Sequence, residues 1–172
     1  MLLPQDYLEK MTLVKSWIRN TLASHHSARI RMTDLNFRRL PSYFEEDTLQ
    51  NTYVIYTDKI PVFPFEEMNL PLFPEMNSIN VAGITYMDSF FALDYLKKDE
   101  VLHFHELIHT IQWKLLGAEK FLELYAIGLI EHGYRMSPLE RMAYDLQDYF
   151  RCGKLFKAET EITRGLKTLK MQ

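Results

Sequence analysis

Two histidines and a glutamate near the middle of the chain have the residue types and the spacing of a metal-dependent hydrolytic site. His105 and His109 are four residues apart, so on an α-helix their side chains lie on one face, one turn apart. Neutral imidazoles held in this way can bind one zinc ion, and Glu106 can then reach a water molecule at the open coordination position. The pattern is typical of zinc-dependent peptide hydrolysis, with Glu106 as the general base that takes the proton of that water.

A catalytic zinc site needs a third protein ligand, and the fourth position is left for water. The downstream residues that could supply this ligand are Glu131, His132, Glu140, Asp145 and Asp148. We favour Glu140, because a carboxylate near the start of a helix can be oriented by the backbone and aimed at a metal. The segment 137–140 also has the pattern of a helix capping box, in which the glutamate has a purely structural role. His132 and Glu131 stay open as alternative ligands.

His105-Glu106-x-x-His109, followed by Glu140-x-x-Ala143, resembles the motifs of the gluzincins, zinc peptidases whose third ligand is a glutamate on a later helix. The second motif is similar to that of the branch with Glu-x-x-Ala-Asp, which includes the membrane CAAX-processing proteases. With Gln112 after the first motif, the chain also resembles short soluble gluzincin-like domains of bacteria. This resemblance implies a zincin-like fold, a bound Zn²⁺ ion and peptides or proteins as substrates.

The resemblance covers residues 101–145, and the sequence departs from the family pattern at one position. The branch has an aspartate four residues after the ligand glutamate, where it supports a zinc-bound histidine. Here that position is Tyr144, and the acid follows one residue later at Asp145. Because Asp145 lies about 140° around the helix from the expected face, the usual support of the histidine is in question.

The tetrahedral intermediate of peptide hydrolysis needs a hydrogen-bond donor for its oxyanion. Tyr134, Arg135 and His132 are candidates, because all three precede the helix that we expect to carry the glutamate. We select Tyr134 among them. The competing interpretation is an ordinary loop with a half-buried tyrosine and a surface arginine.

Further side chains on the motif helix have alternative interpretations. Gln112 lies on the ligand face, where it would hydrogen-bond a metal ligand or a substrate, or be a satisfied buried glutamine. His103 lies about 200° around the helix from His105, which predicts a near-surface position away from the metal. Aromatic residues at helical spacing are expected in the core; they are Trp113, Phe121 and Tyr125.

The first half of the chain predicts one helix and a small sheet. Residues 5–22 have the apolar periodicity of an amphipathic helix, with Tyr7, Met11, Val14 and Ile18 on one face. Strands are predicted over 28–32 and 52–57, and residues 83–93 predict a hairpin bent near residues 87–89. By resemblance, the segment 83–93 is our candidate for the sheet edge that binds substrate as an extra strand. Residues 60–80, with four prolines, predict a long loop that lines or covers a site or packs on the sheet.

The second half predicts only helices. The motif helix is expected over residues 99–116 and ends at Gly117, and an apolar helix follows over 119–130. A third helix is expected over 137–151, and a fourth has Ile162, Leu166 and Leu169 in register.

The composition describes an ordinary globular protein. The 172 residues are 47% hydrophobic and 25% charged, with a net charge of −3, and they predict a single domain over residues 1–172. The net charge is negative and the basic residues cluster only mildly, so nucleic-acid binding is not expected. A single cysteine, Cys152, the lack of a signal-peptide pattern and the lack of a long apolar run predict a cytoplasmic protein with no membrane partner. The sequence does not indicate an oligomeric state.

We therefore expect an α+β, zincin-like domain in which a small sheet packs on the active-site helix and the C-terminal half is mostly helical. The expected function is a zinc metallopeptidase, with Zn²⁺ bound by His105, His109 and Glu140 and with Glu106 and Tyr134 as catalytic groups. A zinc-binding but catalytically silent regulatory or protein-interaction domain is the main alternative. A metal-free structural domain with a coincidental motif is the third.

Overall fold

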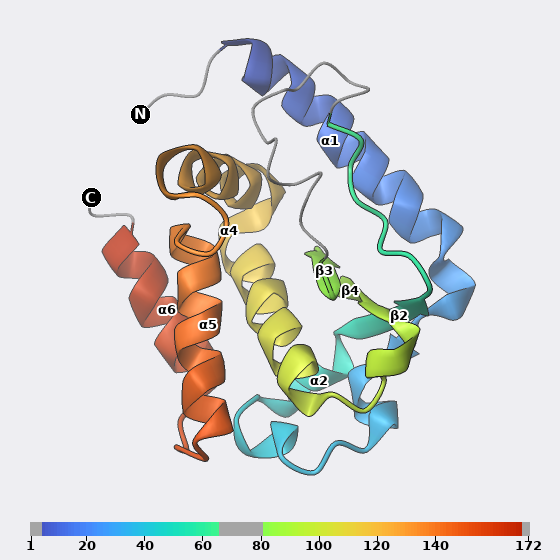
Figure 1. The fold of residues 1–172 in the computed structure, drawn as a ribbon, viewed down its shortest axis with the longest axis vertical. Coiled ribbons are helices and arrows are strands. Elements are labelled where there is room, and N and C mark those ends of the chain that lie inside the picture. Colours follow the sequence, from blue (N-terminus) through green and yellow to red (C-terminus); the bar gives the residue numbers. More distant parts are fainter. Residues whose placement is uncertain (1–4, 66–80, 170–172) are drawn as a thin grey trace.

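The computed structural model describes residues 5–65 and 81–169, which fold as an α+β protein (Figure 1). The helices are α1 (Gln5–Ser24), α2 (Glu46–Gln50), α4 (Glu100–His132), α5 (Pro138–Arg151) and α6 (Ala158–Leu169). The strands are β1 (Ile30–Arg31), β2 (Tyr53–Thr57), β3 (Gly83–Tyr86) and β4 (Ser89–Leu93). Short 3₁₀ helices lie at His26–Ala28, Met32–Leu35, Leu40–Ser42 and Asp94–Leu96.

The four described strands form one mixed sheet in the order β1-β2-β4-β3. β2 and β4 are parallel, whereas β1 pairs with β2 and β3 pairs with β4 in antiparallel fashion. The predicted hairpin over 83–93 is confirmed, and Met87 in its turn has a φ of 60°. β4 is central and buried, while β3 is an edge strand, so one side of β3 is not paired within the described sheet.

Helix α1 extends the predicted helix by two residues, and Met11, Val14 and Ile18 are buried as expected. The strand predicted over 28–32 is only partly correct, because just two residues pair with β2 and both are exposed. The buried residue of this segment is Met32, which begins the following 3₁₀ turn. The alternation of apolar and charged residues over 28–32 therefore predicted too long a strand at this outer edge of the sheet.

Helix α4 carries the motif and bends at Gly117, where a φ of 74° and a ψ of 163° interrupt the helical backbone. The start of α4 is capped by Asp99, whose side chain accepts hydrogen bonds from the backbone N–H groups of Val101 and Leu102. Every residue from His103 to Trp113 is buried, because the first half of α4 lies between the sheet and the C-terminal helices. In Figure 1 the second half of α4 turns away from the first at this glycine, which agrees with two predicted helices separated at Gly117.

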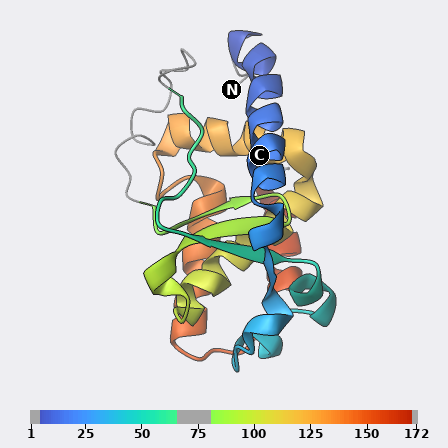
Figure 2. The same cartoon turned by 90° about the vertical axis from the view of Figure 1, so that its right-hand side faces the viewer.

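The helices and the sheet are arranged in successive layers. Figure 1 shows α6, α5, the first half of α4, the sheet and α1 from left to right, and Figure 2 shows α1 in front of the strands. Helices α5 and α6 match the two predicted C-terminal helices, with Ile162 and Leu166 buried. Within the described ranges, no helix combines the length and the apolar character that crossing a membrane would require.

Part of the predicted loop over 60–80 lies outside the described residues, which exclude 66–80. Residues 60–65 contain no helix or strand, and Ile60 and Phe63 are buried. This part of the loop therefore packs onto the body of the protein and, as shown below, lines a cavity beside the motif.

Candidate metal centre

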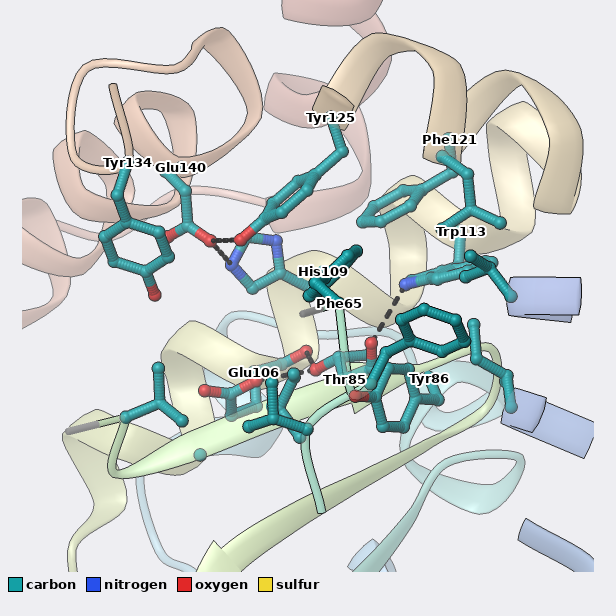
Figure 3. Close-up of a pocket in the computed structure, with 18 residues that line it drawn as sticks. Phe65, Thr85, Tyr86, Glu106, His109, Trp113, Phe121, Tyr125, Tyr134 and Glu140 are labelled. Atoms are coloured by element: carbon teal, nitrogen blue, oxygen red, sulfur yellow. Dashed lines mark hydrogen bonds and ion pairs between the residues drawn. The ribbon is translucent and has the colours of Figure 1, made fainter. Parts of the chain in front are cut away.

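Helices α4 and α5 bring together three side chains that could bind one metal ion. His105 and His109 lie one turn apart on α4, and Glu140 lies in the first turn of α5. The two histidine Nε2 atoms are 3.1 Å apart, His105 Nε2 lies 3.4 Å from Glu140 Oε2, and His109 Nε2 lies 3.5 Å from Glu140 Oε1. All three side chains are buried. Figure 3 shows the carboxylate of Glu140 directed at the ring of His109.

The spacing of these donor atoms fits a tetrahedral zinc ion. Ligand atoms about 2.0–2.1 Å from zinc at tetrahedral angles lie about 3.3 Å from one another. The distance between the two Nε2 atoms, and the distance from each of them to one oxygen of the Glu140 carboxylate, are close to this value. Glu140 Oε2 is buried and has no hydrogen-bond partner within the described part of the chain. Buried oxygens without a hydrogen-bond partner are rare, and a metal ion at this position would give Glu140 Oε2 a partner. The donor set, two imidazoles and one carboxylate, also suits zinc.

The charges of the cluster reinforce one another. Burial alone would raise the pKa of Glu140, but the charge of His109 and the closeness of both imidazole rings hold this pKa well below its usual range. Burial alone would lower the pKa of His109, but the carboxylate of Glu140 outweighs it and raises this pKa to about 9. In the metal-free protein Glu140 is therefore an anion and His109 holds a proton, which a metal ion would displace.

Gln112 orients His109. Its Oε1 lies 2.8 Å from His109 Nδ1, and its Nε2 donates to the carbonyl oxygen of Leu139 at 3.1 Å. Because the carbonyl oxygen of Leu139 accepts from the amide N–H of Gln112, the amide oxygen faces the histidine and Nδ1 carries a proton. A metal ion that displaces the second proton would then meet the lone pair of Nε2. Of the interpretations left open for Gln112, the structure supports contact with a proposed ligand.

Tyr125 is a site residue that the sequence interpretation assigned to the core. It lies on the second half of α4 and its hydroxyl donates to Glu140 Oε1 at 2.8 Å. Its ring stacks on Phe121, which stacks on Trp113. Burial raises the pKa of Tyr125, so the hydroxyl stays protonated and can donate. The sequence carries no signal for this contact, because it depends on how the chain turns between the end of α4 and the start of α5.

The capping box at the start of α5 does not form. The side chain of Ser137 makes no capping hydrogen bond, and its Oγ is buried without a hydrogen-bond partner among the described residues. The carboxylate of Glu140 faces the histidines and Tyr125 instead. The capping role considered for Glu140 is therefore not observed.

The other residues considered as third ligands lie elsewhere. Glu131 and His132 are exposed and lie 3.7 Å from each other. Asp145 is exposed and pairs with Arg141, and Asp148 is exposed on the same helix. None of the four belongs to the described group of possible metal ligands.

Glu106 points toward the edge strand β3, and 4% of its surface is exposed. Its Oε2 accepts a hydrogen bond from Thr85 Oγ1 at 2.6 Å (Figure 3). Burial raises the pKa of Glu106, although His105 and His109 oppose this rise. Gly83 leaves room for the carboxylate, since a Cβ atom there would lie 2.7 Å from Glu106 Oε1. The geometry holds a carboxylate of raised pKa beside the three possible ligands, which suits a proton carrier.

Of the three proposed oxyanion donors, Tyr134 lines the same cavity as Glu106 and Glu140. Burial raises the pKa of Tyr134, which keeps its hydroxyl protonated, and it is hydrogen-bonded to Tyr144. Arg135 is exposed and lies over the ring of Tyr144, 5.0 Å from its centroid, so it does not line this cavity. Tyr134 is thus the member of the set that lines the cavity beside the three possible metal ligands, whereas Arg135 and His132 do not.

The expectation that His103 is near the surface is wrong. Its side chain is fully buried, with Nδ1 2.7 Å from the carbonyl oxygen of Asp99 and Nε2 2.8 Å from the hydroxyl of Tyr56. Phe37 and Phe90 pack against its ring, and burial lowers its pKa. His103 does face away from the ligand pair, but the sheet covers that face of α4.

Comparison of the chain with protein-family models, with curated proteins and with solved structures finds no match. The function of the site is therefore argued from its geometry.

Proposed function

We propose that the protein is a zinc-dependent metallopeptidase of the gluzincin type with a zincin-like fold. In this proposal His105, His109 and Glu140 bind Zn²⁺. The observation that carries it is the buried group of two imidazoles and one carboxylate within 3.5 Å of one another, with the carboxylate of Glu106 beside it. Bound Zn²⁺ supplies Lewis-acid polarisation of a peptide carbonyl and acidifies a water molecule.

Glu106 is the proposed general base. Thr85 holds its carboxylate in place, and burial raises its pKa toward the range in which a carboxylate accepts and returns a proton efficiently. Glu106 takes a proton from the attacking water and then delivers it to the leaving amine. Tyr134, with its protonated hydroxyl in the same cavity, donates a hydrogen bond to the developing oxyanion.

The edge strand β3 supports an extended peptide as the substrate. Leu93 N–H donates to the carbonyl oxygen of Ala82, so by alternation Ile84 and Tyr86 direct their main-chain groups toward β4. The main-chain groups of Gly83 and the N–H group of Thr85 therefore point toward the edge that is unpaired among the described residues, next to Glu106, while the carbonyl oxygen of Thr85 accepts a hydrogen bond from Trp113 Nε1. A peptide that pairs with this edge would pass the catalytic carboxylate.

The test combines metal analysis with hydrolysis of a broad pool of internally quenched peptides. We expect one zinc ion per chain in the wild type and in Glu106→Gln, but loss of about 10²–10⁴-fold in turnover in that variant. Glu140→Ala should lose both zinc and activity. If the wild-type protein binds no zinc after dialysis against a zinc solution, the proposed metal site is excluded. If the Glu106→Gln variant is active, the role of Glu106 as general base is excluded.

A zinc-binding, catalytically silent regulatory or protein-interaction domain is the second candidate. The observation that favours it is the weak support of His105, whose Nδ1 is buried without a hydrogen-bond partner among the described residues. Tyr144, which stands where the related branch has an aspartate, contacts this histidine through its ring, with centroids 4.7 Å apart. Stoichiometric zinc without cleavage of any peptide in the pool would favour this candidate.

A further inference from the structure

A cavity with apolar walls continues from the proposed metal centre, and its residues have no assigned role above. One end contains Glu106, His109, Tyr134 and Glu140, and the other end is enclosed by hydrocarbon. Figure 3 shows the two ends, with Tyr134 and Glu140 on one side and Trp113 and Phe121 on the other. We call the second end the apolar pocket; its walls include Val14, Ile18, Phe63, Ile84, Trp113 and Phe121.

The apolar pocket offers an occupant only apolar contacts, because the polar atoms of its aromatic lining residues already make hydrogen bonds within the protein. Trp113 Nε1 donates to the carbonyl oxygen of Thr85 at 3.2 Å. The hydroxyl of Tyr86 donates to the carbonyl oxygen of Pro61 at 2.9 Å. Charged lining residues are confined to the metal end of the cavity. A polar or charged occupant would therefore lose its hydration without gaining partners, whereas an apolar one would gain from burial.

The position of the apolar pocket fits one residue of a bound peptide. Trp113 lies four residues beyond His109 on α4, a rise of about 6 Å. Beside it, β3 runs from Gly83, opposite Glu106, to Tyr86. A peptide on this edge would place the carbonyl that reacts near Glu106, and the side chain of a residue flanking that bond would reach the apolar pocket.

The volume of the cavity limits which apolar side chains can enter the apolar pocket. The cavity measures about 80 Å³. This volume includes the metal end of the cavity, and a cavity of about 150 Å³ is needed for a benzene ring, so the apolar pocket suits an aliphatic side chain better than an aromatic one. Resting on the proposed function, we propose that the apolar pocket determines substrate specificity by binding a leucine, isoleucine, valine or methionine side chain next to the cleaved bond.

The first test uses peptides that differ at a single position, with leucine, alanine, phenylalanine or aspartate there, and mass spectrometry to identify the cleaved bond. We expect kcat/KM for leucine to exceed that for alanine by about 10- to 100-fold. Phenylalanine should be worse than leucine, and aspartate should not be cleaved at that bond. Equal kcat/KM for leucine and alanine, or a preference for phenylalanine or aspartate, would overturn the proposal.

A pair of neighbouring substitutions on α1 tests the walls. Val14→Phe fills the apolar pocket from α1, where 7% of Val14 is exposed, whereas Leu13→Phe adds the same ring at a residue that is 48% exposed. Val14→Phe should reduce the ratio of kcat/KM for leucine over alanine to within about threefold of unity, and zinc should stay bound. Leu13→Phe should keep the wild-type ratio. An unchanged ratio in folded Val14→Phe contradicts the assignment.

Binding to zinc-loaded Glu106→Gln provides a readout that needs neither turnover nor the Val14 variant. Fluorescence anisotropy should give a Kd about tenfold or more lower for the leucine peptide than for the alanine peptide. Selective leucine binding without any cleavage by the wild type would support the apolar pocket and refute the peptidase. Cleavage without aliphatic preference would refute the pocket alone, and neither binding nor cleavage would refute both.

Discussion

Gly83→Ala should damage catalysis without removing the metal. The new Cβ atom would lie 2.7 Å from Glu106 Oε1 and 3.0 Å from its Cδ, so the carboxylate must retreat by about 0.7 Å to reach an ordinary contact of 3.4 Å. The alanine cannot move into the sheet instead, because the carbonyl oxygen of Phe91 lies 3.1 Å from the same Cβ position. The retreat also strains the hydrogen bond from Thr85. A displacement of about 1 Å costs on the order of 10²-fold in rate, so we expect kcat/KM to fall by about 30- to 100-fold.

The assay measures kcat/KM on one peptide, zinc per chain and the melting temperature. Zinc content should stay at the wild-type level, because Gly83 contacts the base and none of the proposed ligands. Gly165→Ala is the matched control: its Cβ would meet only the Met142 side chain, whose flexible end can move, so full activity is expected. If folded, zinc-loaded Gly83→Ala keeps kcat/KM within threefold of the wild type, our placement of Glu106 is wrong.

Three further substitutions or conditions test the support of the metal centre. Gln112→Leu removes the partner of His109 Nδ1 and should weaken zinc binding by about 10- to 100-fold in a competition titration, whereas unchanged affinity would contradict the orienting role. Tyr125→Phe removes the hydrogen bond to Glu140 and should raise the zinc Kd by about tenfold, with little change in the fold; tighter binding would argue against this contact. The free energy of unfolding of the metal-free protein should be highest below pH 6.5, the unfolded pKa of His109, and fall by up to about 3 kcal/mol as the pH rises through its folded pKa of about 9. Urea unfolding after chelation measures this loss, Glu140→Gln should reduce it, and stability that rises over this range would refute the charge pairing.

The features predictable from the sequence are those that local chemistry determines. The face shared by His105 and His109 follows from helical periodicity, and the helix boundaries follow from an N-cap at Asp99 and a glycine at Gly117. The hairpin follows from two apolar runs separated by Met87 and Asp88. None of these expectations required knowledge of a contact between distant parts of the chain.

The features that escaped the sequence interpretation all depend on tertiary packing. Tyr125 and Glu140 are fifteen residues apart and meet only after the chain has turned between α4 and α5. Thr85 and Gly83 had been assigned to a strand without any link to Glu106, because a strand pattern does not indicate which helix side chain lies against it. His103 was predicted near the surface because it lies about 200° around the helix from His105, but the sheet and α5 cover α4 on both sides.

Gly117 links the proposed chemistry to the proposed specificity. Its φ of 74° and ψ of 163° belong to a region that is essentially restricted to glycine, so the bend is encoded by one residue. The bend returns the second half of α4 across the end of the sheet. From there Tyr125 reaches the carboxylate of Glu140 and Phe121 stacks on Trp113 to close the apolar pocket. The backbone conformation at Gly117 therefore places both a group that hydrogen-bonds a proposed zinc ligand and a wall that would select the substrate beside the first half of α4.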